Sequence, residues 1–194
     1  MPRPLEFDKD KALVKAMNVF WRKGYEATSL QDLLKAMSLS KSSFYQSFTS
    51  KEELFKSCLS HYRNSLAREL IMGLDKAPSA YAFLQQYFRE IADDPHRERL
   101  KGCMLMNTAT EFSQSNPAVA MLVRDGVAHL ETLLTSVVKQ AQKEGDIPAN
   151  KDPQILANFL TTNISGLKTL AKAGTDESML KAIADTLLEA LKKA

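Results

Sequence analysis

The stretch from Gly24 to Phe55 reads GYEATSLQDLLKAMSLSKSSFYQSFTSKEELF and carries the strongest structural signal in this 194-residue chain. Thr28 and Gln31 have the spacing of a capping box, in which a hydroxyl accepts from the third backbone NH of a helix and the later side chain reaches back. A helix is therefore predicted to begin near Ser29. Its apolar positions recur at helical spacing and form one stripe that faces a core: Leu30, Leu33, Leu34 and Met37.

Two more helix starts follow in the same stretch. After a short turn, Ser40 can cap a helix in which Phe44 and Phe48 lie four residues apart and point one way. The opposite face of that helix is polar. Ser50 and Glu53 again have capping-box spacing and begin a longer helix. Together these segments predict a helix-turn-helix, apolar behind and polar in front.

The polar face of the second helix suits duplex DNA. A short helix with small and amide side chains fits a major groove about 12 Å wide, and its N-terminal residues can reach base edges. The candidates for base contacts are Lys41, Ser42, Ser43 and Gln46. Thr28, Tyr45 and Lys51 are expected to hold the DNA backbone. The free NH groups at the helix starts, near Thr28 and Ser29 and near Ser40, add sites for phosphate because a helix N-terminus carries partial positive charge.

This stretch resembles the N-terminal domain of the TetR family of bacterial transcriptional regulators. The family pattern has a glycine and an aromatic after the first helix, Thr-Ser at the second, Ser-Lys-x-x-x-Tyr and Phe in the third, and Ser-Lys-Glu-x-Leu at the fourth. The matching positions are Gly24, Tyr25, Thr28, Ser29, Ser40, Lys41, Tyr45, Phe48, Ser50, Lys51, Glu52 and Leu54. Ser38 departs from the pattern, since the family usually has a turn glycine there, and we expect a small cost in stability.

The rest of the chain also has a helical pattern, so the predicted fold class is all-α. β-branched alternation is almost absent, and Asn-Pro, Asp-Pro and Gly punctuate the apolar repeats. Nine helices are predicted, the number usual in the family, at residues 8–23, 29–36, 40–46, 50–73, 79–92, 101–115, 117–144, 153–173 and 176–192. Pro117 and Pro153 follow capping residues, and Gly24, Gly145 and Gly174 stand where helices are expected to end.

The predicted domains are a helix-turn-helix DNA-binding domain at residues 1–50 and a regulatory and dimerisation domain at residues 51–194. Charge agrees with this division, because residues 1–63 hold 11 Lys and Arg against 7 Asp and Glu, whereas residues 64–194 hold 15 against 16. The positive excess lies on the part that would meet phosphate. The resemblance implies a homodimer that pairs the last two helices, residues 153–192, and reads a palindromic operator.

The segment KGCMLMNTATE, residues 101–111, is the main lead to an effector. It resembles the Gly-Cys-Leu-x-x-Asn start of the sixth helix in one branch of the family, in which some members sense electrophiles or oxidants through the cysteine. The matching residues are Cys103 and Asn107. A thiolate in the first turn is favoured by the helix field, and Lys101 could add to that effect. The alternative is that Cys103 is a packed apolar residue, which is our expectation for Cys58.

A reversible apolar or aromatic ligand is the competing hypothesis for the effector. It would bind among the fourth to eighth helices, near Met104, Met106, Phe112 and Phe159. Methionines adapt to varied ligands, but they also fill ordinary cores.

Several other classes of protein find no support in the sequence. It has no Gly-rich phosphate loop, nucleophile elbow or catalytic acid or histidine set, so we predict no enzyme and no cofactor. His61, His96 and His129 are scattered without ligand spacing, which predicts no metal site. No apolar run is long enough to span a membrane and no leader is evident, so we expect a cytoplasmic protein without membrane partners. In that reducing compartment the two cysteines are not expected to form a disulfide.

The predicted function is a one-component TetR-like transcriptional regulator, which in this family is most often a repressor. It would hold double-stranded operator DNA and release it when an effector modifies or occupies the C-terminal domain. Repression or activation depends on where the operator lies relative to a promoter and stays open. The alternative is a helical adaptor whose first domain docks a protein. A DNA reader differs from such an adaptor because its affinity falls steeply with salt.

Overall fold

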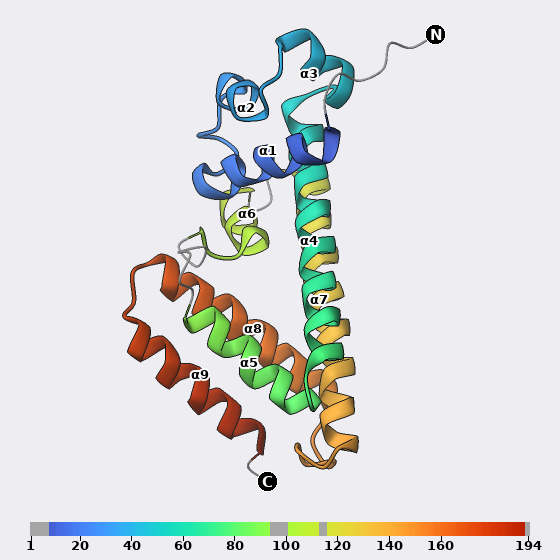
Figure 1. Cartoon of the computed structure of the whole chain (residues 1–194), viewed down its shortest axis with the longest axis vertical. Helices are drawn as coiled ribbons and strands as arrows, with labels where there is room; N and C mark the ends of the chain where they lie inside the picture. The colour runs from blue at the N-terminus through green and yellow to red at the C-terminus, as the bar shows by residue number, and fades with distance from the viewer. Residues whose placement is uncertain (1–7, 94–100, 113–115, 193–194) are drawn as a thin grey trace.

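The computed structural model describes residues 8–93, 101–112 and 116–192. Over these ranges the chain forms nine α-helices and no strand, which confirms the all-α prediction (Figure 1). The helices are α1 Lys9–Lys23, α2 Leu30–Met37, α3 Lys41–Phe48, α4 Lys51–Lys76, α5 Ala80–Ala92, α6 Met104–Phe112, α7 Pro117–Lys143, α8 Pro153–Lys172 and α9 Glu177–Lys192.

The second helix begins at the predicted place, but a different pair of residues caps it. Ser29 Oγ accepts from the backbone N of Asp32 at 3.1 Å, and Asp32 Oδ2 accepts from the backbone N of Ser29 at 3.0 Å. The predicted capping box of Thr28 and Gln31 is therefore wrong. Thr28 turns toward α1 instead, because its hydroxyl donates to the carbonyl oxygen of Gly24 at 2.5 Å and closes the preceding turn.

The other helix starts follow their sequence signals. Ser40 and Ser50 each accept from a backbone NH three residues ahead at 3.1 Å. Asn116 and Asp152 cap α7 and α8, and each is followed by a proline at the first helical position. Proline suits that position because its missing NH would have no partner inside the helix. Polar side chains that bond to backbone NH groups of the first helical turn thus mark most of the helix starts.

Some helix ends differ from the prediction. The buried side chain of Phe48 continues the apolar face of α3 past residue 46, and α4 extends to Lys76. α6 begins later than predicted, at Met104, because Gly102 adopts a positive φ of 72° that no α-helix contains. The last predicted residues of that helix, 113–115, lie outside the described residues.

Two long helices give the molecule its length. α4 and α7 run side by side along the vertical axis of Figure 1, and α1, α2 and α3 surround the start of α4. We call residues 8–55 the head. α5, α8 and α9 pack together at the opposite end, and α6 lies between them and α1. Because α4 belongs to both parts and the buried core is continuous, the domain boundary at residues 50 and 51 stays a prediction.

Candidate nucleic-acid interface and effector region

α3 places a polar face on an apolar base. Phe44 and Phe48 are buried in the head. At the helix start, the hydroxyl of Ser40 lies 2.9 Å from the hydroxyls of both Ser42 and Ser43. This arrangement holds three hydroxyls beside the free NH groups of the first turn. A helix start with such donors favours an anion such as phosphate.

The predicted DNA contacts on α3 share one surface. Lys41, Ser42, Tyr45 and Gln46 are all exposed, and Ser43 is half-buried beside them. Tyr45 is 49% exposed, and its ring packs edge-on against Phe44, with 5.2 Å between the ring centres. Packing against Phe44 on one side supports the ring, while about half of the residue stays exposed. α3 therefore brings together small, amide, aromatic and cationic side chains on one exposed helix face.

The predicted contacts outside α3 differ from one another. Thr28 is fully buried and its hydroxyl is bonded to Gly24, so its side chain does not reach the surface, and the contact of Thr28 with DNA stays a prediction. Ser29 is exposed, but its hydroxyl donates to Asp32 Oδ2 at 2.8 Å. Lys51 is half-buried, with Nζ 4.2 Å from the centre of the Tyr25 ring, a cation–π contact that holds the ammonium at the start of α4.

An ion pair that sequence reasoning missed joins α1 to α2. Lys23 Nζ lies 2.9 Å from Asp32 Oδ1. The Lys23 ammonium has the largest effect on the Asp32 carboxyl, and the Ser29 hydroxyl and backbone NH add to it. Together these groups hold the pKa of the Asp32 carboxyl well below its usual range. The two residues lie nine positions apart on different helices, so no helical spacing in the sequence indicates the pair. Only the crossing of α1 and α2 brings them together.

The far end of α6 is bonded to the head. The Glu111 carboxylate accepts from the backbone N of Tyr25 at 2.9 Å and from that of Glu26 at 2.7 Å. Gly24, with φ 83°, makes room for it, because a Cβ there would lie 3.0 Å from Glu111 Oε2. Phe112 stacks on Phe55 with 5.4 Å between ring centres. Sequence reasoning missed Glu111 because these partners lie more than eighty residues apart.

The near end of α6 is also bonded to the head. Trp21 Nε1 donates to the carbonyl oxygen of Gly102 at 3.1 Å. Lys101 Nζ donates to Asn18 Oδ1 at 3.0 Å and lies 5.0 Å from the centre of the Trp21 ring. The residues at both ends of α6 thus contact α1 or the turn that follows it.

Cys103 lies directly before α6 and is 6% exposed. The Tyr62 hydroxyl is 3.9 Å from its sulfur. Asn107 stabilises this turn, since its Nδ2 donates to the Lys101 carbonyl oxygen at 2.8 Å while its Oδ1 accepts from Lys172 Nζ at 3.2 Å. The ammonium of Lys101 is engaged with Asn18 and Trp21 of α1, and its effect on the Cys103 thiol stays a prediction.

The second cysteine is a packed core residue, as predicted. Cys58 has no exposed surface, and its thiol donates to the Leu13 carbonyl oxygen at 3.8 Å. Burial raises the pKa of the Cys58 thiol. Both cysteines are free thiols.

The four residues predicted to surround an apolar ligand do not form one site. Phe112 packs against the head, whereas Phe159 is 38% exposed and lines a groove of about 360 Å³ with residues of α9. Met104 is buried and Met106 half-buried on α6. The grouping is wrong because helical spacing does not reveal which element each face contacts.

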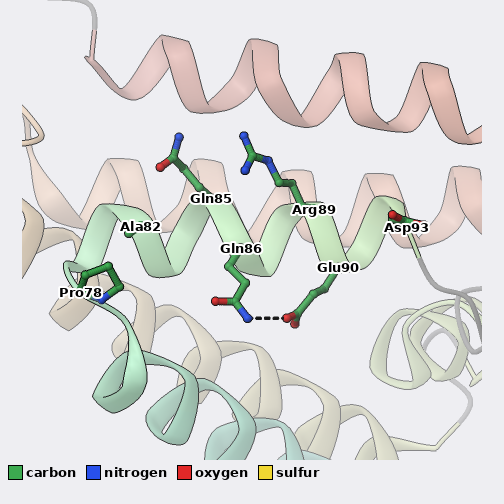
Figure 2. Close-up of a pocket in the computed structure, with 7 residues that line it drawn as sticks. All are labelled: Pro78, Ala82, Gln85, Gln86, Arg89, Glu90 and Asp93. Carbon is green, nitrogen blue, oxygen red and sulfur yellow. Dashed lines mark hydrogen bonds between the residues drawn. The ribbon is translucent and has the colours of Figure 1, made fainter.

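A different groove, of about 490 Å³, lies along the outer side of α5 (Figure 2). Gln85 and Arg89 point to one side of the helix, while Gln86 and Glu90 point to the other and are joined by a hydrogen bond of 2.8 Å. Five of its seven lining residues are polar or charged, and the groove is open to solvent. In the described part of the chain, no three His, Cys, Asp or Glu side chains gather as a metal site would require, and no helix is long and apolar enough to cross a membrane.

Two family models match this chain along most of its length. The model described as "Bacterial regulatory proteins, tetR family" matches residues 12–58, which contain α2, α3 and the start of α4. The model described as "Tetracyclin repressor-like, C-terminal domain" matches residues 81–187, more than half of the chain. The chain belongs to the TetR family. The first model covers the exposed face of α3, and the second covers Cys103 and both ends of α6.

Individual TetR-family proteins are similar over nearly the whole chain. The transcriptional repressor ComR of Escherichia coli K12 is 36% identical over 188 residues, which cover 96% of this chain and 90% of ComR. The regulator YezE of Bacillus subtilis strain 168 is 29% identical and covers 98% of this chain and 100% of YezE. A structure of the regulator CifR, a cysteine variant bound to 26-bp operator DNA, has a TM-score of 0.83 and 32% identity, covering 97% of this chain and 99% of CifR.

Proposed function

We propose that this TetR-family protein is a cytoplasmic transcriptional repressor that binds a palindromic operator as a homodimer and releases it when an effector acts on the C-terminal domain. The observation that carries the proposal is the exposed polar face of α3, built on a capped helix start and bonded through the head to α6. Similarity to the repressor ComR and to CifR in complex with operator DNA supports it. In this proposal the protein regulates transcription and has no catalytic activity.

The reading of DNA is assigned to α3. Gln46 can bond adenine with both atoms of its amide, Ser42 can donate or accept at several bases, and Lys41 suits guanine or a phosphate. Tyr45 and Lys51 would contact the DNA backbone, as would the NH groups at the starts of α2 and α3. Ser29 contributes by capping the start of α2, because Asp32 engages both its hydroxyl and its backbone NH.

Homodimerisation is assigned to α8 and α9. Ile155, Phe159 and Leu170 follow one another along one side of α8 and are 66%, 38% and 40% exposed. Met179 of α9 is 55% exposed and joins Phe159 in the groove of about 360 Å³. A Cβ added at Gly166 would meet nothing within 4 Å, so this side of α8 is open to close approach. A two-fold pair through this face would present two α3 helices about 34 to 36 Å apart, one turn of the duplex.

Release is assigned to α6. An electrophile or oxidant that modifies Cys103, or a ligand that binds beside it, would displace the Gly102 turn that is bonded to Trp21. The same helix holds Tyr25 and Glu26 through Glu111. The effector needs only to bind more tightly to the conformation in which the two heads are spaced wrongly for DNA. A preference of about 10⁴-fold for that conformation would leave almost no operator occupied.

The deciding experiment is fluorescence anisotropy of the reduced dimer with DNA that flanks its own gene, over a salt series with nonspecific competitor. We expect tight binding that resists the competitor. The logarithm of the association constant should fall with the logarithm of the salt concentration, with a slope of about −0.9 for each phosphate neutralised. Tyr45→Ala should weaken binding to all sequences alike, whereas Gln46→Ala should change the preferred sequence. Salt-insensitive binding, together with failure to select any operator from genomic fragments, would favour the protein-docking adaptor instead.

Sensing through Cys103 has its own test. After treatment with N-ethylmaleimide, we expect mass spectrometry to find the adduct on Cys103 and anisotropy to record loss of operator binding. Cys103→Ser should retain operator binding and resist the reagent, while Cys58→Ser, which leaves the sensing thiol in place, should respond like the wild type. An unreactive Cys103 in the folded dimer would show that this residue is only packed.

A further inference from the structure

A groove of about 270 Å³ lies between α4 and α5. Each of its walls is a stripe of four residues at positions i, i+3, i+4 and i+7, from Glu69 to Lys76 on α4 and from Phe83 to Glu90 on α5. Residues 77–79 join the two helices, which diverge from that turn (Figure 1). Lys76 and Phe83 therefore flank the end of the groove beside the turn, whereas Glu69 and Glu90 flank the end farthest from it.

Apolar side chains form the base of the groove. Phe83 lies against the bare backbone of α4, because a Cβ added at Gly73 would be 2.7 Å from Phe83 Cε2. The Phe83 ring stacks on that of Tyr87 with 5.8 Å between the ring centres, and both residues are only 4% exposed. Met72, on the opposite wall, is 54% exposed. Two packed rings and an adaptable thioether can hold an aromatic or aliphatic body.

The end of the groove away from the turn is acidic. Glu69 and Glu90 are both exposed and stand on opposite walls. Within the described ranges, Glu90 accepts from Gln86 Nε2 at 2.8 Å, and Glu69 forms no hydrogen bond or ion pair. Lys76 is the one cation that the described residues contribute to the lining, and it lies about 10 Å from Glu69 along α4. Two carboxylates that face one groove repel each other, so a cation is favoured between them.

The Tyr87 hydroxyl adds a neutral acceptor to this lining. Three buried side-chain oxygens lack a hydrogen-bond partner in the part of the chain that the structure describes, those of Ser47, Tyr87 and Thr161, and only Tyr87 lines the groove. Tyr87 stands one helical turn before Glu90 on the same wall. A buried hydroxyl without a partner costs free energy that a bound N–H donor recovers, since a phenol oxygen can accept as well as donate.

We propose that the groove between α4 and α5 binds a small organic amine. Its ammonium donates to the Glu69 and Glu90 carboxylates and to the Tyr87 hydroxyl, while its apolar body lies against Met72 and Phe83. The same two carboxylates disfavour an organic anion. Binding of the amine does not rest on the proposed repressor function, whereas a role of the amine as effector does.

The test is isothermal titration calorimetry of the reduced full-length protein with phenethylamine, tryptamine and hexylamine at neutral pH. Each amine is compared with the neutral alcohol that has the same body: 2-phenylethanol, tryptophol and hexanol. At least one amine should bind, and its alcohol should bind at least about tenfold more weakly, because charge-assisted hydrogen bonds are lost. The affinity for the amine should also fall as salt rises, since the carboxylates are exposed.

Substitutions of the two carboxylates locate the ammonium. Glu69→Gln and Glu90→Gln should each weaken amine binding by about fivefold or more and keep the melting temperature, because both side chains are exposed. Asp75→Asn removes the same charge from an exposed position of α4 outside the groove and should leave amine affinity within about twofold.

Tyr87→Phe provides a further variant that should fold normally, because the hydroxyl it removes has no partner. We expect it to keep the melting temperature of the free protein and to weaken the amine by several-fold.

Three outcomes would overturn the site: binding of none of the three amines, equal affinity for each amine and its alcohol, or unchanged amine affinity in Glu69→Gln and Glu90→Gln. Unchanged affinity in Tyr87→Phe would overturn the placement of the ammonium beside the hydroxyl. Anisotropy with operator DNA is measured separately, so amine binding without operator release would keep the site and remove only its regulatory role.

Discussion

Ser38 stands between α2 and α3 with φ 58° and ψ 41°, a left-handed conformation that glycine adopts without strain. Its backbone NH donates to the Lys35 carbonyl oxygen at 3.3 Å, so the turn depends on this conformation. We predict that Ser38→Gly stabilises the free protein by about 0.5 to 1 kcal/mol. Urea unfolding measures the change, with Ser38→Ala as the control that keeps the strain. A loss of stability in the glycine variant would contradict this account.

Asp32 gives the head a dependence on pH. Because Lys23, and then Ser29, lower the pKa of its carboxyl, the native state holds its proton less tightly than the unfolded chain. The stability that Asp32 contributes is therefore present above its ordinary pKa of 3.8 and is lost as the pH falls toward the lowered value.

We predict that Asp32→Asn lowers the melting temperature near neutral pH and that the difference from wild type shrinks below about pH 4. Thermal melts from about pH 7 down to about pH 2.5 follow it. Asp8, Glu52 and Asp176 also have lowered pKa values, but they are the same in both proteins, so the difference isolates Asp32. A constant difference across the series would show that the ion pair contributes nothing.

At the scale of elements, α6 is the short helix whose far end is bonded to the head. Its Glu111 carboxylate accepts two backbone NH groups from the turn after α1, and a carboxylate with two such donors is a strong acceptor. Glu111 and the turn after α1 lie far apart in the sequence, and only the fold brings them together.

We predict that Glu111→Ala lowers the stability of the head by about 1 kcal/mol and reduces the change in operator affinity on modifying Cys103. Fluorescence anisotropy with operator DNA gives, for each variant, the ratio between the operator affinities of the reduced protein and of the protein modified at Cys103. Glu26→Ala removes an exposed carboxylate from the same turn and should behave as the wild type. An unchanged ratio in Glu111→Ala would exclude this contact from the coupling.

The presence and the starts of the helices were predicted best from the sequence, because their signals lie within a few residues of one another. A cap bonds to NH groups two or three residues away, so Ser40, Ser50, Asn116 and Asp152 could be read without knowledge of the fold. The cap of α2 was misassigned because Thr28 and Ser29 are adjacent hydroxyl residues and the sequence alone does not say which one turns back to Gly24. The start of α6 was missed because it follows from the positive φ of Gly102.

At the scale of the whole molecule, the exposed apolar side of α8 is the face through which we propose that two copies pair. The sequence shows one apolar pattern in α8, but the fold divides it: Leu160 and Ile164 are buried, whereas Ile155 and Phe159 face outward. Burying such side chains against a second copy is favourable by about 25 cal/mol per Å² of apolar surface.

We predict that Phe159→Glu converts the dimer to a monomer and weakens operator binding by about 100-fold or more, because the second head no longer binds from the same complex. Sedimentation velocity gives the oligomeric state and anisotropy the affinity. Met121→Glu places the same charge at an exposed methionine of α7 and should leave both unchanged. A dimeric Phe159→Glu would move the interface elsewhere.

The sequence by itself determined the all-α class, the order of the helices and the face of α3, because caps, turn residues and helical periodicity act over one to four residues. It also indicated Cys103 and Asn107 as a pair at the start of α6. Tertiary structure alone decided that Thr28 is buried, that Glu111 holds the head and that Phe159 faces outward. These depend on which helices cross and where, and packing between residues far apart in the chain leaves no local pattern to read.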